Sequence, residues 1–446
     1  MLKTYLQRKI YRQLTGEKEF ILRNTAPSEE ELHSRFQDIN EMGIYLHIPF
    51  CRFICPYCPY NKELYSADLA RKYTASVIKE IDYYASVAGS RPVTSFYIGG
   101  GTPTTMLYNG IETIISHIYR SFNMKCSVHI ESHPNDLTVA NLNHLKSIGI
   151  NYLSIGVEAL QDRHLRTLNR PYTSEEVKQS VGRAVNMGFD CVNVDFIFAL
   201  PGQSYQEIEQ AGNVLVGMGV QQAATYPLFY FPYTRMGQDI VKKSPDATLL
   251  LRRRKMLNIL EHIFYDSGFE RSSAWAFTKK GTEKYCSVTV PLYLGLGASG
   301  GSYLNDIFFL NTFNVASYIE SIKQNKIPTA LSVELTEKMQ MAGWLYWRIY
   351  ETRFSKNDFC RKFKTDFDGK YGRLMRSFSG IGFLEDDGQQ IVLTDRGAYW
   401  LHAFEDWFSI DFISNLWGNS KNVPWPGKIV LISDRNRSDP WKRIKL

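Results

Sequence analysis

The sequence lacks any long hydrophobic run. No apolar stretch in its 446 residues approaches the ~18–20 residues that a membrane-spanning helix needs, so a membrane span is excluded. The opening residues MLKTYLQRKIYRQL mix basic with apolar side chains and do not resemble a secretory signal. Hydrophobic residues make up 44% and charged residues 22%, which excludes general disorder. We therefore expect a folded cytoplasmic protein.

Cysteine is also scarce. Seven cysteines, an odd number, are too few for a disulfide scaffold in a chain of this length. Three of them, Cys51, Cys55 and Cys58, fall within eight residues. The other four are isolated, and we interpret them as small buried hydrophobes or free thiols: Cys126, Cys191, Cys286 and Cys360. The cysteine signal is therefore a single cluster.

The middle of the chain has no excess of charge of one sign. Residues 1–25 hold six Lys or Arg against two Glu, and residues 433–446 hold five against two Asp, which accounts for the whole formal charge of +7. A nucleic-acid-binding domain usually carries a basic face on the folded domain itself. We therefore interpret the basic ends as solvated tails and expect no nucleic-acid partner.

Short β-rich runs alternate with helical segments from residue 43 to about residue 325. The six predicted strands are Ile44–Ile48, Ser95–Ile98, Ser127–Glu131, Tyr152–Val157, Cys191–Phe196 and Ala224–Leu228. The helices between and after them are predicted over 67–88, 110–122, 138–147, 174–186, 205–217 and 248–267. This alternation predicts an α/β fold with a mainly parallel sheet. Six units are too few for a closed eight-stranded barrel, so we expect a partial (β/α)6 barrel with its functional groups at the C-terminal strand ends.

The two ends of the chain follow other patterns. Residues 1–42 predict an N-terminal arm, with an amphipathic helix over 1–14 followed by a polar stretch over 24–42. Residues 326–446 predict a small winged-helix-like α+β domain and the basic tail. Its expected elements are helices over Val333–Tyr350, Lys356–Phe363 and Leu374–Ser379, a hairpin over Gly380–Thr394 and a helix from Arg396.

The cysteine cluster has the spacing CxxxCxxC and follows the first predicted strand directly. Zinc normally takes four protein ligands, and no fourth Cys or His lies at a suitable offset. Three thiolates would leave one iron of a [4Fe–4S] cluster open to a ligand that is not protein. The spacing therefore favours an iron–sulfur cluster over zinc.

Further candidate residues lie at later strand ends. Gly99-Gly100-Gly101-Thr102-Pro103 follows the second strand, where glycines let the backbone approach a ligand closely. Glu131, Glu158, Arg170 and Asp195 follow or end the next three strands, and each alone fits a structural ion pair or cap equally well. At the mouth of one barrel they could together bind an amine, a carboxylate and ribose hydroxyls.

These strings resemble the radical S-adenosylmethionine (SAM) superfamily, and within it the oxygen-independent coproporphyrinogen III oxidase family. The matching segments are His47-Ile-Pro-Phe-Cys51, Gly-Gly-Gly-Thr-Pro-Thr, Glu131-Ser-His-Pro, Asn169-Arg170, Leu200-Pro-Gly-Gln203 and Gly295-Leu-Gly-Ala-Ser-Gly300. The resemblance implies a [4Fe–4S] cluster on Cys51, Cys55 and Cys58 and one or two molecules of SAM. In that family, one electron from the cluster cleaves SAM to methionine and a 5′-deoxyadenosyl radical, which abstracts hydrogen from the substrate.

The resemblance also implies roles for single residues. Tyr57 would shield the cluster and touch the adenine, Tyr45 would lie near the cofactor, and both join Glu158 as candidate catalytic residues. The candidate SAM-binding residues are Tyr45, Tyr57, Gly99, Gly100, Gly101, Thr102, Glu131, Glu158, Arg170 and Asp195. Within that set, Glu131 would contact the amino-acid end, Arg170 would pair with the carboxylate, and Asp195 would hold the ribose or a second cofactor.

Three departures leave the reaction open. Tyr60 stands where the true oxidase has a fourth cysteine, Glu158 replaces the usual Gln, and His133 replaces the usual acidic residue. We expect a radical enzyme acting on a tetrapyrrole or similar planar substrate, with an electron donor such as flavodoxin or ferredoxin. The alternatives are an anaerobic haem-degrading enzyme, a class C radical methyltransferase that uses two SAM molecules, and a non-catalytic haem chaperone.

Overall fold

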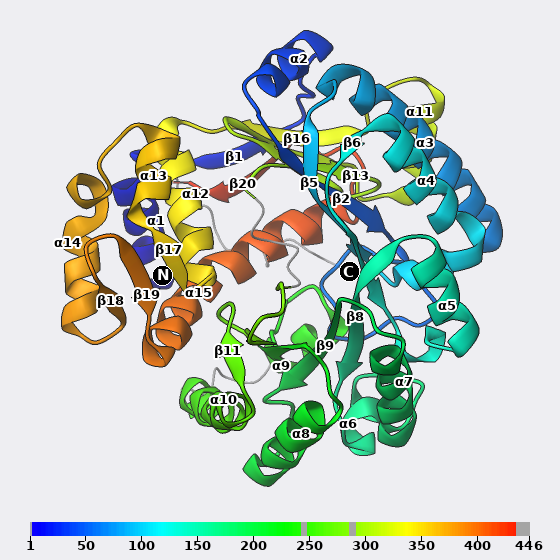
Figure 1. Ribbon diagram of the computed structural model, residues 1–446. Coiled ribbons are helices and arrows are strands. Elements are labelled where there is room, and N and C mark those ends of the chain that lie inside the picture. The colour runs from blue at the N-terminus through cyan, green and yellow to red at the C-terminus, as the bar shows by residue number, and fades with distance from the viewer. Residues whose placement is uncertain (1, 242–247, 285–290, 434–446) are drawn as a thin grey trace.

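Six parallel strands form the centre of the molecule (Figure 1). The computed structural model describes residues 2–241, 248–284 and 291–433, so Cys286 and nearly all of the basic tail lie outside the described residues. The strands are β2 (Met42–Ile48), β5 (Pro92–Gly100), β7 (Val128–Ser132), β8 (Ile150–Glu158), β9 (Cys191–Phe198) and β10 (Gln222–Pro227). They pair in this order, each parallel to the next, which confirms the predicted partial (β/α)6 barrel.

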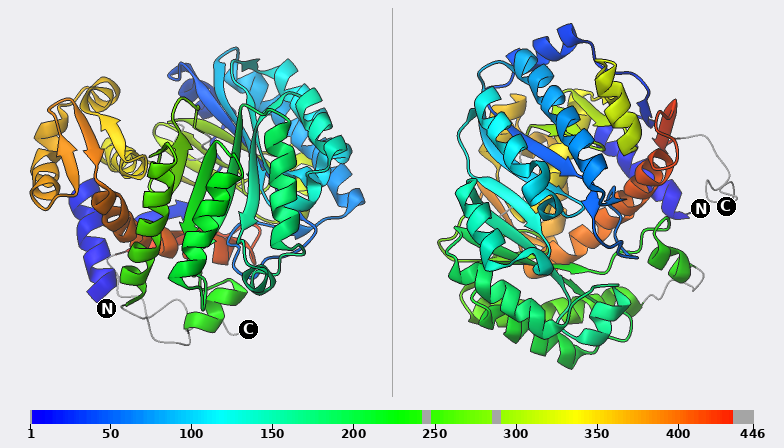
Figure 2. Two further views of the ribbon diagram at one scale, coloured as in Figure 1. Left: turned by 60° about the horizontal axis from the view of Figure 1, so that its bottom comes forward. Right: turned by 90° about the vertical axis from the view of Figure 1, so that its right-hand side faces the viewer.

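Helices cover the outer face of these strands (Figures 1 and 2). They are α3 (Ala67–Ala88), α4 (Glu112–Ser121), α5 (Val139–Ser147), α6 (Asp162–Thr167), α7 (Ser174–Asn186), α8 (Tyr205–Gly217) and α10 (Thr248–Asp266). The helix α9 (Arg235–Val241) lies instead beside the cysteine loop, where the amide of Met236 donates to the carbonyl of Pro56. The helices α7 and α8 both begin with a capping box, in which Thr173 and Ser204 satisfy the first backbone amides. Side chains such as Tyr45, Tyr97 and Tyr152 face the barrel interior, while their neighbours along each strand pack under the helices.

The sheet continues beyond the six strands at both edges. At one edge stand β12 (Ala276–Lys279) and β11 (Phe269–Arg271). At the other stand β13 (Tyr293–Leu296), β14 (Gly301–Leu304), β15 (Ile307–Asn311), β16 (Thr329–Glu334), β1 (Phe20–Arg23) and β20 (Lys428–Ile432), with α11 (Val315–Lys323) between β15 and β16. The strand β1 belongs to the predicted N-terminal arm and β20 to the predicted C-terminal domain, so the sheet crosses both predicted domain boundaries. The division of the chain at 42/43 and 325/326 stays a prediction.

The N-terminal segment has more structure than the sequence predicted. Its first helix is α1 (Leu2–Thr15), and the stretch expected to be merely polar contains α2 (Glu29–Gln37). The side chain of Ser28 accepts from the amide of Glu31, and Glu31 accepts in return from the amide of Ser28. This capping box offsets the low hydrophobicity of α2, whose Leu32 and Phe36 are buried.

The C-terminal lobe is small and mostly helical. It comprises α12 (Glu337–Tyr350), β17 (Arg353–Ser355), α13 (Lys356–Phe363), α14 (Phe367–Gly380), β18 (Leu384–Asp386), β19 (Gln390–Leu393) and α15 (Asp395–Ser420). The predicted hairpin is present as β18 and β19, and β17 adds a third strand to it. The predicted helix from Val333 was wrong in its first turn, because residues up to Glu334 pair with β15 and Thr336 caps the helix. The predicted helix Leu374–Ser379 is the end of a longer one that Asp366 caps.

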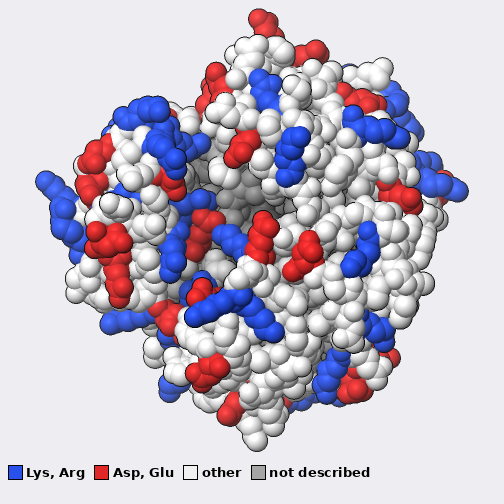
Figure 3. Space-filling model, in the orientation of Figure 1, with Lys and Arg blue, Asp and Glu red and all other residues white. Residues whose placement is uncertain are grey.

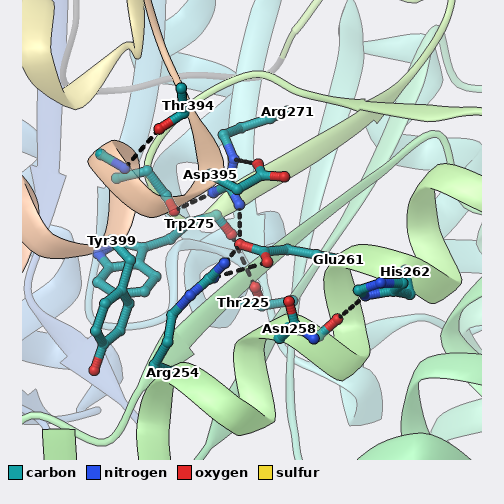
Figure 4. A network of polar contacts seen from close by, with 12 residues as sticks. Thr225, Arg254, Asn258, Glu261, His262, Arg271, Trp275, Thr394, Asp395 and Tyr399 are labelled. Atoms are coloured by element: carbon teal, nitrogen blue, oxygen red, sulfur yellow. Dashed lines mark hydrogen bonds and ion pairs between the residues drawn. The ribbon is translucent and has the colours of Figure 1, made fainter. Parts of the chain in front are cut away.

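Helix α15 joins the two edges of the curved sheet. Near its N-terminal end, His402 packs against Trp275, just before β12, and near its C-terminal end Trp417 packs against Phe313, just after β15. Figure 4 shows the anchor at its start, where Arg271 bonds both Asp395, at 3.0 Å, and Glu261. Glu261 also accepts two 2.7 Å bonds from Arg254. This buried network fixes the helix to α10 and β11.

A second joint holds β2 to the late glycine segment. The carboxylate of Glu80, on α3, accepts from the amide of Gly297 (2.7 Å), the hydroxyl of Tyr318 (2.6 Å) and the amide side chain of Asn311 (2.6 Å). Gly297 has φ +87°, and a Cβ there would lie 2.3 Å from the Tyr73 hydroxyl, so the turn requires glycine. This joint closes β13 against the first strand of the barrel.

The surface bears mixed charge. On the face in Figure 3, basic and acidic side chains are interspersed rather than segregated. Among the described residues, no helix is both long and apolar enough to cross a lipid bilayer.

Candidate cluster and cofactor site

The three clustered cysteines lie on the loop that leaves β2. Cys51 is buried in the short strand β3 (Phe50–Cys51), which pairs with β4 (Glu63–Leu64), and Cys55 and Cys58 are half-buried in the loop between. The hydroxyl of Thr102 donates to the sulfur of Cys51 at 3.6 Å. The two short strands therefore close the loop at its base and bring its thiols together.

Contacts from the rest of the barrel fix the course of this loop. The ammonium of Lys62 donates to the carbonyls of Cys58 (2.6 Å) and Tyr60 (3.1 Å). On the other side, the side-chain amide of Asn169 donates to the carbonyl of Ile54 at 3.0 Å. The backbone between the cysteines is thus held independently of any metal.

His47 connects the loop to the barrel interior. Its Nε2 lies 3.0 Å from the carbonyl of Asn61, which can only accept, so Nε2 carries the proton and Nδ1 accepts from the Tyr45 hydroxyl at 3.0 Å. Burial lowers the pKa of His47 to about 4, so the ring stays neutral at physiological pH. The sequence-predicted Tyr45 therefore lies beside the loop with its hydroxyl oriented by His47.

The glycine motif packs the second strand end against the loop. The amides of Gly101 and Thr102 donate to the carbonyls of Ile48 (2.7 Å) and Phe50 (2.8 Å). A Cβ on Gly101 would lie 2.8 Å from the Phe50 carbonyl, so only glycine permits this approach.

Glu131 lies next to this motif at the end of β7. Its carboxylate accepts from the Tyr97 hydroxyl at 2.7 Å and from the amide of Gly100 at 2.9 Å. Burial, with a contribution from the charge of Glu158, raises the pKa of Glu131 to about 7 although both hydrogen bonds lower it. A Cβ on Gly99 would lie 2.9 Å from this carboxylate, so the glycine leaves room for it.

Asp195 lies across the barrel mouth on β9. It accepts from the Ser154 hydroxyl at 2.8 Å and from the side-chain amide of Asn193 at 3.2 Å. Burial and the charges of Glu158 and Glu131 raise its pKa to about 7. The buried Oδ1 of Asn193 accepts no hydrogen bond from the described residues and is available to a ligand hydroxyl.

Glu158 and Arg170 form a buried ion pair between these carboxylates and the cysteine loop. The guanidinium of Arg170 bonds Glu158 and also donates to the Tyr57 hydroxyl at 2.8 Å. Glu158 has φ +66° at a bulge in β8, a conformation that is strained for a side-chain-bearing residue and recurs at functional sites. The buried Nε of Arg170 finds no acceptor among the described residues. An acceptor from a ligand would satisfy it.

The structure thus brings all the predicted site residues to one end of the barrel. The electrostatic coupling of Cys55 with Arg170 and Glu158 places the ion pair beside the thiols, and Asp195 and Glu131 couple to Glu158 in turn. Three carboxylates face one guanidinium. Such a pocket favours a ligand with more positive than negative charge, as in an amine and a sulfonium set against a single carboxylate.

Comparisons with known proteins agree with this arrangement. Residues 45–215 match the family model for the radical SAM superfamily. The chain is 26% identical over 360 residues to the heme chaperone HemW of Bacillus subtilis, covering 79% of this chain and 95% of that protein. It is 21% identical over 382 residues to the oxygen-independent coproporphyrinogen III oxidase of Pseudomonas aeruginosa, covering 80% and 83%. The structure of coproporphyrinogen III oxidase (HemN) from Escherichia coli superposes with a TM-score of 0.74 at 20% identity, covering 85% of this chain and 93% of that one.

Residues 45–215 form a radical SAM domain, and the chain as a whole is similar to HemN-like proteins. Its cofactors are a [4Fe–4S] cluster and SAM. The residues present fit both groups, because thiolates are the usual ligands of iron–sulfur clusters and the orphaned Arg170 Nε lies among the carboxylates. No three Cys, His, Asp or Glu side chains in the described parts of the chain converge on one point as a single-ion site requires.

A row of inward-facing aromatic rings, which the sequence did not predict as a unit, lies deeper in the barrel than Glu131. Tyr45, Tyr97, His129 and Tyr152 stand in register on four adjacent strands. Tyr45 and Tyr97 stack with ring centres 6.1 Å apart, and His129 and Tyr152 stack at 4.1 Å. The alternation of residues along each strand was a signal for this row. Each of the four residues lies two positions before another inward-facing polar residue or glycine of the same strand.

Proposed function

We propose that this protein is a radical enzyme that cleaves SAM and acts on a tetrapyrrole or a similar planar substrate. The observation that carries the proposal is the placement of three thiols beside a buried pocket with three carboxylates and one guanidinium. When bound, the reduced cluster supplies the electron that releases a 5′-deoxyadenosyl radical from SAM. The protein's own residues bind and orient SAM and exclude water from it.

The contacts support a division of work among the residues. Arg170, with its free Nε, would hold the carboxylate of SAM, while Glu131 and the carbonyls around Gly99–Thr102 would hold its amine. Asp195 with Asn193 would hold ribose hydroxyls or a second SAM. Tyr57, fixed by Arg170, would shield the cluster and touch the adenine. Glu158 would keep Arg170 oriented and set the charge near the reacting atoms.

The aromatic row supports a planar substrate. Glu131 lies two residues beyond His129 on β7, so a planar molecule deeper in the barrel than this carboxylate would meet the aromatic row on one side. The same row fits bound haem equally well. A haem chaperone is therefore the second candidate, and the similarity to HemW over 95% of that protein's length favours it.

Anaerobic turnover separates these candidates. The reconstituted, dithionite-reduced protein is given SAM with and without coproporphyrinogen III or haem, and products are read by mass spectrometry. An enzyme gives 5′-deoxyadenosine that rises with one tetrapyrrole, with loss of two carboxyl masses for an oxidase or a gained methyl and S-adenosylhomocysteine for a methyltransferase. Conversion of haem to an opened tetrapyrrole indicates a haem-degrading enzyme. Stable haem binding with no substrate-dependent 5′-deoxyadenosine contradicts the enzyme and supports the chaperone.

A further inference from the structure

A cavity of about 630 Å³ opens beside the cysteine loop. Cys55 and Cys58 both line it, together with Tyr233 and Trp417. Its lining contains the basic residues Lys62, Arg166, Arg235 and Lys421 and no Asp or Glu. The lining of this cavity is therefore strongly basic.

These cations differ from others nearby. Arg163 bonds Glu207 and Arg52 bonds Asp136, as is usual for surface arginines. By contrast, Arg166, Arg235 and Lys421 are exposed and make no ion pair with a described carboxylate, and Lys62 bonds only backbone carbonyls. Their positive potential is therefore available to a partner.

Exposed apolar side chains lie among these charges. Ile54, between the first two cysteines, lines the cavity and is 39% exposed. Phe53, the neighbour of Ile54, is 48% exposed. A small apolar centre with unpaired charges around it is typical of brief encounters between proteins, in which the charges raise the association rate.

We propose that this basic patch (Ile54, Arg166, Arg235 and Lys421) is the docking site of an acidic one-electron donor protein. The proposal rests on the function proposed above, because the cluster must receive an electron from outside. Two of its three thiolates line the cavity, so a partner docked there lies at short range from the cluster. With a reduced flavodoxin as donor, one electron leaves the anionic flavin hydroquinone, which becomes the neutral semiquinone, and the oxidised cluster gains it; no bond forms or breaks.

The test uses the reconstituted full-length protein and flavodoxin. The variant Arg166→Glu/Arg235→Glu/Lys421→Glu reverses the patch, and Lys370→Glu/Arg373→Glu/Arg376→Glu on α14 is the control with the same change of charge. Binding of oxidised flavodoxin is measured at two salt concentrations, and cluster reduction by flavodoxin hydroquinone is followed by electron paramagnetic resonance. We expect the patch variant to bind at least ~10-fold more weakly and to be reduced correspondingly more slowly, while the control binds within ~2-fold of wild type. Wild-type binding should weaken as salt rises.

Equal binding by wild type and the patch variant overturns the proposal, as does an equal loss in both triple variants. Reduction by dithionite needs no docked protein, so it tests the proposed function separately from the docking site. If dithionite-reduced wild type forms no 5′-deoxyadenosine, the proposed function fails whatever flavodoxin binding shows. If dithionite supports turnover in the patch variant but flavodoxin does not, the docking site is supported.

Discussion

Glu80 and Glu131 are two buried glutamates on either side of β2, and both have a pKa raised to about 7 by burial. Glu80 accepts three hydrogen bonds from side chains and backbone of the protein and meets no other carboxylate among its contacts. Glu131 accepts two, and it shares its pocket with Glu158, Asp195 and the unsatisfied Nε of Arg170. The shifted pKa therefore does not separate a structural group from a functional one. The neighbouring groups do, since one site is complete within the protein and the other is completed by a ligand.

The largest expected effect is the loss of the iron–sulfur cluster. Replacing Cys51, Cys55 and Cys58 together by Ala should lower the iron content of the reconstituted protein from about four per chain to near zero, because no other described thiol lies on the loop. The fold should survive, since Lys62 and Asn169 hold the loop without the thiols. Iron assay and circular dichroism measure both results. Cys360→Ala, in the C-terminal lobe, is the control and should keep its iron.

The second-largest expected effect is a loss of stability in Glu80→Ala. This substitution leaves the amide of Gly297, the hydroxyl of Tyr318 and one N–H of the Asn311 side chain buried without an acceptor, so we expect the free energy of unfolding to fall by ~3–5 kcal/mol. Glu131→Ala removes a carboxylate from a crowded pocket and should cost less than ~2 kcal/mol. Urea unfolding of the cluster-free proteins gives both values. Equal losses would remove the distinction between the two glutamates.

Binding of SAM should show the reverse order. Glu131→Ala should weaken SAM binding at least ~10-fold, or ~1.4 kcal/mol, because the amine loses its nearest carboxylate. Glu131→Gln keeps the shape without the charge and should fall between Ala and wild type. Asp68→Ala, an exposed carboxylate on α3, should bind SAM like wild type. Isothermal titration under anaerobic conditions measures these affinities, and an unchanged affinity in Glu131→Ala would place the amine elsewhere.

The smallest expected difference between the two glutamates is in their dependence on pH. The folded pKa of Glu80 lies above its unfolded value of 4.5, so its protonated form stabilises the fold, and this contribution is lost as pH rises through about 7. Between pH 6 and pH 8, wild type should lose ~1 kcal/mol more stability than Glu80→Gln. SAM affinity should instead rise over the same range as Glu131 ionises. A Glu80→Gln profile parallel to wild type would show that Glu80 is ionised throughout.

Much of the fold could be predicted from local sequence patterns. Each of the six strands is a short apolar run between turn signals, and the capping box of Thr173 and Glu176 marks a helix start without any tertiary information. The cysteine loop and the other candidate site residues could be named from the sequence, because spacing along the chain and strand ends mark them, and their roles stay predictions. The sheet beyond β2 was not predicted, because pairings such as Phe20 with Ile432 join residues that are far apart in the sequence.

Other residues escaped prediction for a similar reason. Nothing in the sequence around Glu80 indicates that α3 places it against Gly297, and Tyr97 acquires its role only where β5 and β7 lie side by side. The helix α2 is different, because its capping box is visible in the sequence and was overlooked in a segment of low hydrophobicity.

The central claim is that three thiolates hold a [4Fe–4S] cluster, and that SAM bound among the carboxylates contacts the iron that has no thiolate ligand. The most direct test is electron paramagnetic resonance of the reduced, reconstituted protein before and after SAM is added, together with an iron assay. The account predicts about four irons per chain and a spectrum whose g values shift with SAM in wild type, with a shift that needs more SAM in Glu131→Ala. A spectrum that SAM leaves unchanged, at four irons per chain and saturating SAM, would contradict it.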